Sequence, residues 1–479
     1  MKRVIIPGLA PLWLVLLEAA PALAGTGEHA GYHLEGGGLA GWWALPFAGM
    51  LLSIAVGPLV DRHFWDRHFG KVAAFWAVLF LVPCWLVHGG RVAAYVLLET
   101  MLLEYLPFVI LLLALFTIAG GIRLTGTLAG SPRVNALMLL IGTFLASLMG
   151  TTGAAMLLIR PLLRANAHRR YRVHTVIFFI FLVANIGGSL TPLGDPPLFL
   201  GFLKGVTFFW PAVHLYDKML FVSAVLLGLY LVLDSLLYRR EGRPRPGGAE
   251  RFEPLRLEGL VNFPLLAGVL GLVLLSGLWT GGPRFHVWAD IDVALPNLTR
   301  DLALLGLTVL SVLLTRAEIR RGNGFTWEPI LEVAKLFAGI FVTMVPAIAI
   351  LRAGPDGALS GLVALASTAE GQPVNYMYFW LTGLLSSFLD NAPTYLVFFN
   401  LAGGDAHRLM DFMPETLAAV SAGAVFMGAN TYIGNAPNFM VRVIADENGV
   451  KMPSFFGYMA WSVGILIPVF ALVTLIFFL

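Results

Sequence analysis

Two aspartates inside apolar segments are the residues of this 479-residue chain that are best suited to chemistry. Asp195 follows the stretch NIGGSLTPLG and precedes two prolines, and Asp390 begins the stretch DNAPT. A carboxylate at the centre of a membrane helix costs about 2.5–3.5 kcal/mol on insertion scales. Burial favours the neutral carboxyl group, so a proton and a metal cation would compete for its oxygens. We therefore expect Asp195 and Asp390 to bind cations and protons; the alternative is that each caps the helix that follows it.

Neutral oxygen donors surround both aspartates in the sequence. Hard cations such as sodium prefer carboxylate, amide, hydroxyl and backbone oxygens. The asparagines also have a structural alternative, because their amides can tie broken helices together by hydrogen bonds. The predicted sodium- and proton-binding set is Asp195, Asp390, Thr151, Thr152, Asn185, Thr191, Asn391, Thr394, Asn430, Thr431 and Asn435. No other cofactor is expected.

The composition places these residues in a membrane. The chain is 58% hydrophobic and 12% charged, against roughly 45–50% and about 25% in soluble domains. The formal net charge is only +3, and the basic residues lie in a few loops rather than in a stripe, which excludes nucleic acid as a partner. The single cysteine, Cys84, excludes an intrachain disulfide.

Residues 1–24 have the order of a signal peptide, with a basic start, an apolar stretch and small residues around Ala24. An uncleaved first helix is the alternative. Beyond it, segments of about 20 apolar residues predict membrane spans. They lie near 41–60, 72–88, 100–121, 173–198, 218–238, 263–279, 300–315, 330–351, 415–434 and 455–479.

Two further apolar segments, 136–163 and 374–402, contain polar or Gly/Pro-rich residues in their middle. Arginines cluster on both sides of the first, whereas the second has one arginine on each side. Because Lys and Arg accumulate in cytoplasmic loops, the first should enter and leave from the cytoplasm and the second from outside. Each arm of about 14 residues would rise only ~21 Å as a helix, short of the ~30 Å hydrocarbon core. Both segments are therefore predicted to be re-entrant hairpins.

The same element order occurs twice, from opposite sides of the membrane. TPLGDPPLFL at 191–200 aligns with TYIGNAPNFM at 431–440, and SLMGTTGAAMLL at 147–158 with SSFLDNAPTYLV at 386–397, which sets Thr151 and Thr152 against Asp390 and Asn391. We expect an all-α polytopic membrane protein with two inverted repeats of three helices, a hairpin, a broken helix and a last helix. Repeat 1 spans 41–238 with its broken helix near 173–204, a cytoplasmic linker spans 239–262, and repeat 2 spans 263–479 with its broken helix near 415–440. The C-terminus is then external.

These motifs resemble the ion transporter superfamily of secondary transporters, in particular its bacterial sodium/proton antiporter and citrate-transporter branches. The resemblance rests on NIGGSLTPLGDPP with GANTYIGNAPN, and on the tips GTTG and LDNAPT. It implies hairpins that open to opposite sides, elevator-type alternating access, a homodimer, and location in a bacterial inner membrane. Citrate transporters of the superfamily carry Ser-Asn-Thr tips, which this chain lacks.

Three functions are compared on this basis. The first is sodium/proton exchange, because an Asp beside a citrate carboxylate repels it unless a cation lies between them. The alternative is sodium- or proton-coupled transport of citrate or a related organic anion. An intramembrane aspartyl protease using Asp195 and Asp217 is disfavoured, because a protease does not explain an inverted repeat, and no motif of another enzyme class is present. The chain is expected not to be an enzyme.

Three charged residues outside these motifs have open roles. His174 follows an arginine cluster and is expected at the membrane interface, with a role in pH sensing as the alternative. Glu104 is expected to pair with an arginine, to relay protons or to lie in an interfacial helix. Lys204 is expected to extend toward the external surface.

Overall fold

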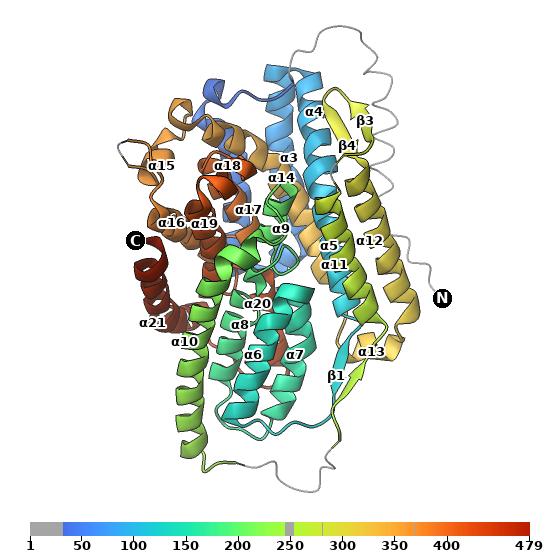
Figure 1. Ribbon diagram of the computed structural model, residues 1–479, viewed down its shortest axis with the longest axis vertical. Coiled ribbons are helices and arrows are strands. Elements are labelled where there is room, and N and C mark those ends of the chain that lie inside the picture. Colours follow the sequence, from blue (N-terminus) through green and yellow to red (C-terminus); the bar gives the residue numbers. More distant parts are fainter. Residues whose placement is uncertain (1–31, 245–252, 280, 369) are drawn as a thin grey trace. The chain divides into compact units, whose positions relative to one another are not determined.

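The computed structural model describes residues 32–244, 253–279, 281–368 and 370–479, so the expected signal peptide at 1–24 lies outside the described residues. Leu34–Leu479 form one unit by their contacts. Helices make up nearly all of its secondary structure (Figure 1). Eight helices of the described part are long and apolar enough to cross a membrane. This confirms the all-α polytopic fold class, whereas the inverted repeat stays a prediction. One of the eight is Pro132–Met149, which the prediction treats as a hairpin arm too short to cross, whereas the predicted spans 173–198, 263–279 and 415–434 correspond to shorter helices.

The first half of the chain contains long helices followed by a helical hairpin and a broken helix. Among the described residues its helical elements are η2 (Gly36–Gly38), η3 (Gly41–Ala44), α2 (Leu45–Val60), α3 (Arg62–His88), α4 (Gly90–Glu99), η4 (Thr100–Tyr105), α5 (Leu106–Ala119), α6 (Pro132–Met149), α7 (Thr151–Ala165), α8 (Val173–Leu182), η5 (Ile186–Ser189), α9 (Pro196–Leu203) and α10 (Trp210–Arg240). α3 begins ten residues before the predicted span, and α4, η4 and α5 form one apolar helix from Gly90 to Ala119, longer than the predicted 100–121.

The second half follows the same order with more short connecting helices. Its described helical elements are α11 (Asn262–Leu278), α12 (Leu295–Leu314), α13 (Ala317–Gly322), α14 (Glu328–Arg352), η6 (Gly354–Asp356), α15 (Ser360–Leu365), α16 (Asn375–Phe388), α17 (Asn391–Leu401), α18 (Ala406–Asp411), α19 (Pro414–Met427), η7 (Gly428–Asn430), α20 (Ala436–Glu447), α21 (Phe455–Val473) and η8 (Thr474–Phe478). Two antiparallel pairs of short strands lie in loops: β1 (Arg123–Thr125) with β2 (Arg256–Glu258), and β3 (Arg284–Trp288) with β4 (Ile291–Ala294).

Each predicted hairpin is a pair of helices joined by a turn at one end, and a hydrogen bond links the two arms near the other end. α6 and α7 turn at Gly150, whose φ of 82° is strained for any residue with a side chain. At the other end of this hairpin the Gly130 amide donates to the Ala165 carbonyl at 2.8 Å. α16 and α17 turn at residues 389–390, and the Tyr378 hydroxyl donates to the Leu401 carbonyl at 3.4 Å. In Figure 1 the first hairpin lies at the lower end of the view beside β1, and the second lies in the upper half.

The two broken helices pack against the hairpins crosswise. α7, the second arm of the first hairpin, packs on α20, which follows the break in the second half. α17, the second arm of the second hairpin, packs on α9, which follows the break in the first half. The unwound segments 183–195 and 428–435 therefore lie where all four elements come together. Proline at the start of α9 and α20 fixes where each helix resumes, because proline fits the first turn of a helix.

Two hydrogen bonds between a hairpin and a broken helix of the first half recur in the second half, with each residue number increased by 240. The Thr191 hydroxyl donates to the Ser147 carbonyl, and the Thr431 hydroxyl donates to the Ser387 carbonyl. The Ser147 hydroxyl donates to the Gly187 carbonyl, and that of Ser387 to the Met427 carbonyl. This recurrence supports the two-repeat prediction. It also differs by one residue from the predicted alignment of the tips, because it pairs Thr151 with Asn391 rather than with Asp390.

Candidate ion-binding site

The carboxylate of Asp195 is the centre of the site. Asp195 stands at the N-cap position of α9, yet its side chain makes no capping hydrogen bond. The next two residues are prolines, which have no N–H, and the N–H of Leu198 after them donates to the backbone carbonyl of Asp195 at 3.1 Å. The residue is 1% exposed, so its two oxygens must find partners within the protein. The carboxylate of Asp195 is thus buried without a capping role.

Three side chains from the three other elements reach this carboxylate. The Thr151 hydroxyl, at the start of α7, lies 3.1 Å from Asp195 Oδ1. The Asn391 amide, at the start of α17, lies 2.5 Å from Oδ2. The Asn435 amide, directly before α20, lies 3.1 Å from Oδ1. Both hairpin tips and both broken helices therefore meet at a single carboxyl group.

A second layer of amides holds Asn435 in place. Asn435 also donates to Asn185 Oδ1 and to the Ala184 carbonyl, both at 3.2 Å. Asn185 in turn donates to Asn438 Oδ1 at 2.7 Å, and Asn438 donates to the carbonyls of Gly428 and Thr431. The three asparagines are 0–2% exposed. They thus link the two unwound segments to each other, which is the structural role expected for buried amides.

Hydroxyl groups satisfy the backbone that the helix breaks leave open. Thr191 and Thr431 each donate to a serine carbonyl of the neighbouring hairpin and accept from a backbone N–H two residues on. Ser387 accepts from the Asn430 amide at 2.9 Å. These contacts hold each unwound segment against its own hairpin, which non-helical backbone at membrane depth requires.

Asp390 is used differently from Asp195. Its Oδ1 accepts from the Ala392 amide at 3.0 Å, so it caps α17, and the Thr394 hydroxyl donates to its carbonyl. Asp390 directly precedes Asn391, whose amide contacts Asp195, so the two carboxyl groups belong to the same region of the site. Thr152 is half-buried beside Thr151, and it is not among the described side chains that donate to Asp195. Cation binding by Asp390, Thr152 and Thr394 stays a prediction.

Two amide oxygens near the centre are without a donor in the described part of the chain. They are Asn391 Oδ1 and Asn430 Oδ1, and both are buried. A buried acceptor without a partner costs about 1–3 kcal/mol. Oxygens of this kind are the ligands that a hard cation prefers. The nitrogen of Asn391 contacts Asp195 while its oxygen has no donor, so this side chain can join the carboxylate to a neighbouring cation.

Comparison with known proteins gives the family. The sequence profile described as "Putative citrate transport" matches residues 36–478, which is nearly the whole described chain. The chain belongs to this family. It is also 26% identical over 367 residues to uncharacterized transporters from Mycobacterium bovis and Mycobacterium tuberculosis, and this match covers 72% of the chain and 79% of each relative. Together with the eight candidate spans, these findings indicate a multi-pass membrane transporter rather than an enzyme.

Two residues outside the predicted binding set help to position the site of this citrate-transport family member. Ser387 and Asn438 hold the second unwound segment in place. A tip alignment with an offset of 240 would have indicated Ser387, because it then faces Ser147. Asp217, the second protease candidate, pairs with Lys218 and is 56% exposed, so it does not form a pair with the buried Asp195.

The remaining charged candidates lie outside the Asp195 site. His174 Nε2 lies 2.8 Å from Asp234, within a buried cluster that also contains Arg169, rather than at an exposed interface. Lys204 does not extend to the surface alone: its ammonium group pairs with Glu104, so Glu104 pairs with a lysine and not with an arginine. This ion pair joins the end of α9 to η4.

Proposed function

We propose that the protein couples the transport of citrate or a related organic anion to that of a sodium ion or a proton bound at Asp195. The observation that carries the proposal is the convergence of Thr151, Asn391 and Asn435 on the Asp195 carboxylate. The description of the family supplies the class of anion. The transported species are thus a cation and an organic anion, and no resident cofactor takes part.

Coupling follows from charge. An ionised Asp195 repels a citrate carboxylate, whereas a protonated or sodium-bound Asp195 does not. The cation therefore binds first, between Asp195 and the free amide oxygen of Asn391. The anion then binds to the neutralised site, with the remaining hydroxyl and amide donors of the two hairpin tips as hydrogen-bond partners. An empty site keeps the charge of the Asp195 carboxylate, which disfavours movement through the membrane without the cation.

Sodium/proton exchange is the second candidate, and one observation favours it. The donors that contact Asp195 are a hydroxyl and two amides, and none of them is an arginine. A bidentate arginine is the usual partner of a carboxylate substrate. Without one, the site is better suited to a cation than to a multivalent anion, and competition between sodium and protons at Asp195 is enough for exchange.

We further propose that the hairpins and broken helices move together past the other helices, as in an elevator, and that the protein is a homodimer in a bacterial inner membrane with its C-terminus outside. The crosswise packing of α7 on α20 and of α17 on α9 supports a common motion of these four elements. The orientation rests on the basic loops at 160–172, 239–256 and 316–321.

Transport by purified protein in proteoliposomes separates the two candidates. Labelled citrate uptake that requires an inward sodium or proton gradient supports anion transport. Sodium-driven change of a lumenal pH dye without citrate uptake supports exchange instead. Asp195→Asn should abolish the activity in either case. Normal activity of this variant in both assays would contradict the proposed role of Asp195.

A further inference from the structure

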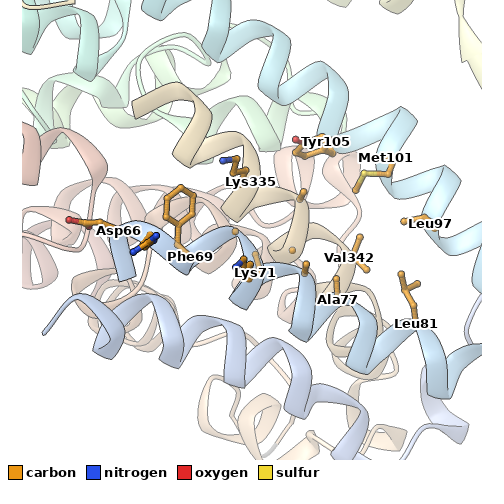
Figure 2. A pocket seen from close by; sticks show the side chains of 16 residues that line it. Asp66, Phe69, Lys71, Ala77, Leu81, Leu97, Met101, Tyr105, Lys335 and Val342 are labelled. Carbon is orange, nitrogen blue, oxygen red and sulfur yellow. The ribbon is translucent and has the colours of Figure 1, made fainter. Parts of the chain in front are cut away.

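A groove on another part of the molecule is separate from the Asp195 site. It has a volume of about 630 Å³ and lies between α3, the α4–η4 helix and α14. Figure 2 shows its side chains, with charged residues gathered toward one end and apolar residues toward the other. None of the residues that line it belongs to the predicted ion-binding set.

Small residues create the groove. Gly70, Ala73, Ala74 and Ala77 occupy the lining face of α3. α3 and α14 approach each other closely at Gly339: a Cβ added to this residue would lie 2.9 Å from the Cβ of Ala73. Larger side chains at these positions would fill the space, so its shape is a direct consequence of the sequence.

One end of the groove is basic. Arg67, Lys71 and Lys335 line it together with one acidic residue, Asp66. Lys335 Nζ lies 5.4 Å from the centre of the Phe69 ring. Among the described residues no ion pair involves Arg67, Lys71 or Lys335. Three cations at one end of the groove are therefore without an ion-pair partner among the described residues, although the carboxylates of Asp66 and Glu332 lie near this end.

The other end of the groove is apolar, and the distance between the two ends matches the thickness of one leaflet. Leu81, Leu97, Met101 and Val342 line it. Lys71 and Leu81 are ten residues apart on α3, which corresponds to about 15 Å along a helix. This is half of the ~30 Å hydrocarbon core. A ligand that fits both ends has a charged head and a long apolar tail.

We propose that this groove is a binding site for an anionic glycerophospholipid, with the phosphate at Lys71 and Lys335 and an acyl chain along Ala77 and Leu81. A basic pocket between membrane helices is the usual form of such a site. On the topology predicted from loop charge, the basic end opens to the cytoplasmic leaflet. α14 also packs on α17, the hairpin arm that begins at Asn391. A lipid in the groove would thus contact α14, which packs on the helix that begins at Asn391.

The test measures lipid binding to the full-length protein in detergent by native mass spectrometry and thermal shift. The probes are phosphatidylglycerol, phosphatidylcholine with the same acyl chains, and inorganic phosphate. We expect phosphatidylglycerol to bind and stabilise, and the two other probes to have little effect. Lys71→Gln with Lys335→Gln should weaken phosphatidylglycerol binding about 30-fold, at about 1 kcal/mol for each basic residue.

Two further variants make the result specific. Arg316→Gln with Lys451→Gln removes two exposed cations elsewhere and should leave lipid binding unchanged. Ala74→Phe fills the groove from an exposed position and should reduce phosphatidylglycerol binding while the basic residues remain. Equal stabilisation by phosphatidylcholine, an equal effect of inorganic phosphate, or full phosphatidylglycerol binding by the Lys71/Lys335 variant would overturn the proposal. The proposal would also be overturned if Ala74→Phe binds phosphatidylglycerol as the wild type does but no longer self-associates.

Discussion

Asn391 and Asp195 are 196 residues apart in the chain, and the amide nitrogen of Asn391 lies 2.5 Å from the carboxylate of Asp195. The first belongs to the tip of the second hairpin and the second to the broken helix of the first half. Neither half of the chain forms this contact alone. This hydrogen bond forms only when the two halves are correctly assembled. Removing it is therefore the most direct experiment on the site.

Asn391→Ala removes one of three donors to the buried carboxylate. A hydrogen bond to a charged group contributes about 1.5–3 kcal/mol, so we expect a lower thermal unfolding temperature and loss of transport. Thermal unfolding in detergent and uptake into proteoliposomes measure the two effects. Asn448→Ala, which removes an amide that bonds only the carbonyl of its own helix, should change neither. Unchanged transport by Asn391→Ala would show that this contact is dispensable.

Asp390 can be tested as a cap and as a charge separately. Asparagine caps a helix about as well as aspartate, whereas alanine costs about 0.5–2 kcal/mol at this position. We expect Asp390→Asn to keep the thermal stability and to weaken sodium- or proton-dependent transport, because a charge near Asp195 is lost. Asp390→Ala should lower both. Wild-type transport and cation dependence in Asp390→Asn would mean that Asp390 is only a cap.

The ion pair between Lys204 and Glu104 joins α9 to η4 and offers a test of relative motion. If α9 moves with the hairpins past η4, cross-linking cysteines at these two positions should stop transport, and a reducing agent should restore it. The background is Cys84→Ser, because Cys84 is the only native cysteine. Cysteines at Arg123 and Glu258, paired residues of β1 and β2, provide the matched control. Undiminished transport by the oxidised 104/204 pair would contradict the elevator.

The buried cluster around Asp234 should dominate the stability of the first hairpin's open end. Asp234 contacts Arg169, His174, Tyr230 and Asn135, and the side chains of Asp234 and Arg169 are fully buried. Removing one partner of a buried ion pair costs about 3–5 kcal/mol. Asp234→Asn is therefore expected to lower the unfolding temperature strongly. Asp217→Asn, which breaks a half-exposed pair on the same helix, should have little effect, and equal shifts for both variants would count against this interpretation.

The sequence predicted the all-α membrane fold because apolar length is a strong signal. Glycine, proline and polar residues also indicated where the paired helices turn and where the two helices break, whereas the re-entrance of the hairpins stays a prediction. The sequence did not distinguish the roles of the two aspartates. Asp195 and Asp390 both precede helices, and only the structure shows that the first carboxylate makes no capping hydrogen bond while the second accepts from the N–H of Ala392. The sequence also did not show which side chains contact each other between the two halves, because these contacts join residues about 200–250 positions apart.

The crosswise packing of α7 on α20 and of α17 on α9 has a consequence for how the protein can be made. A polypeptide ending before residue 245 contains Asp195 and Thr151 but lacks Asn391 and Asn435, so its carboxylate keeps one donor instead of three. The two halves expressed as separate polypeptides would have to find each other within the bilayer before either could bury that charge. In the single chain the covalent link keeps the two halves close together. All three donors to Asp195 are in place only after both halves have been inserted.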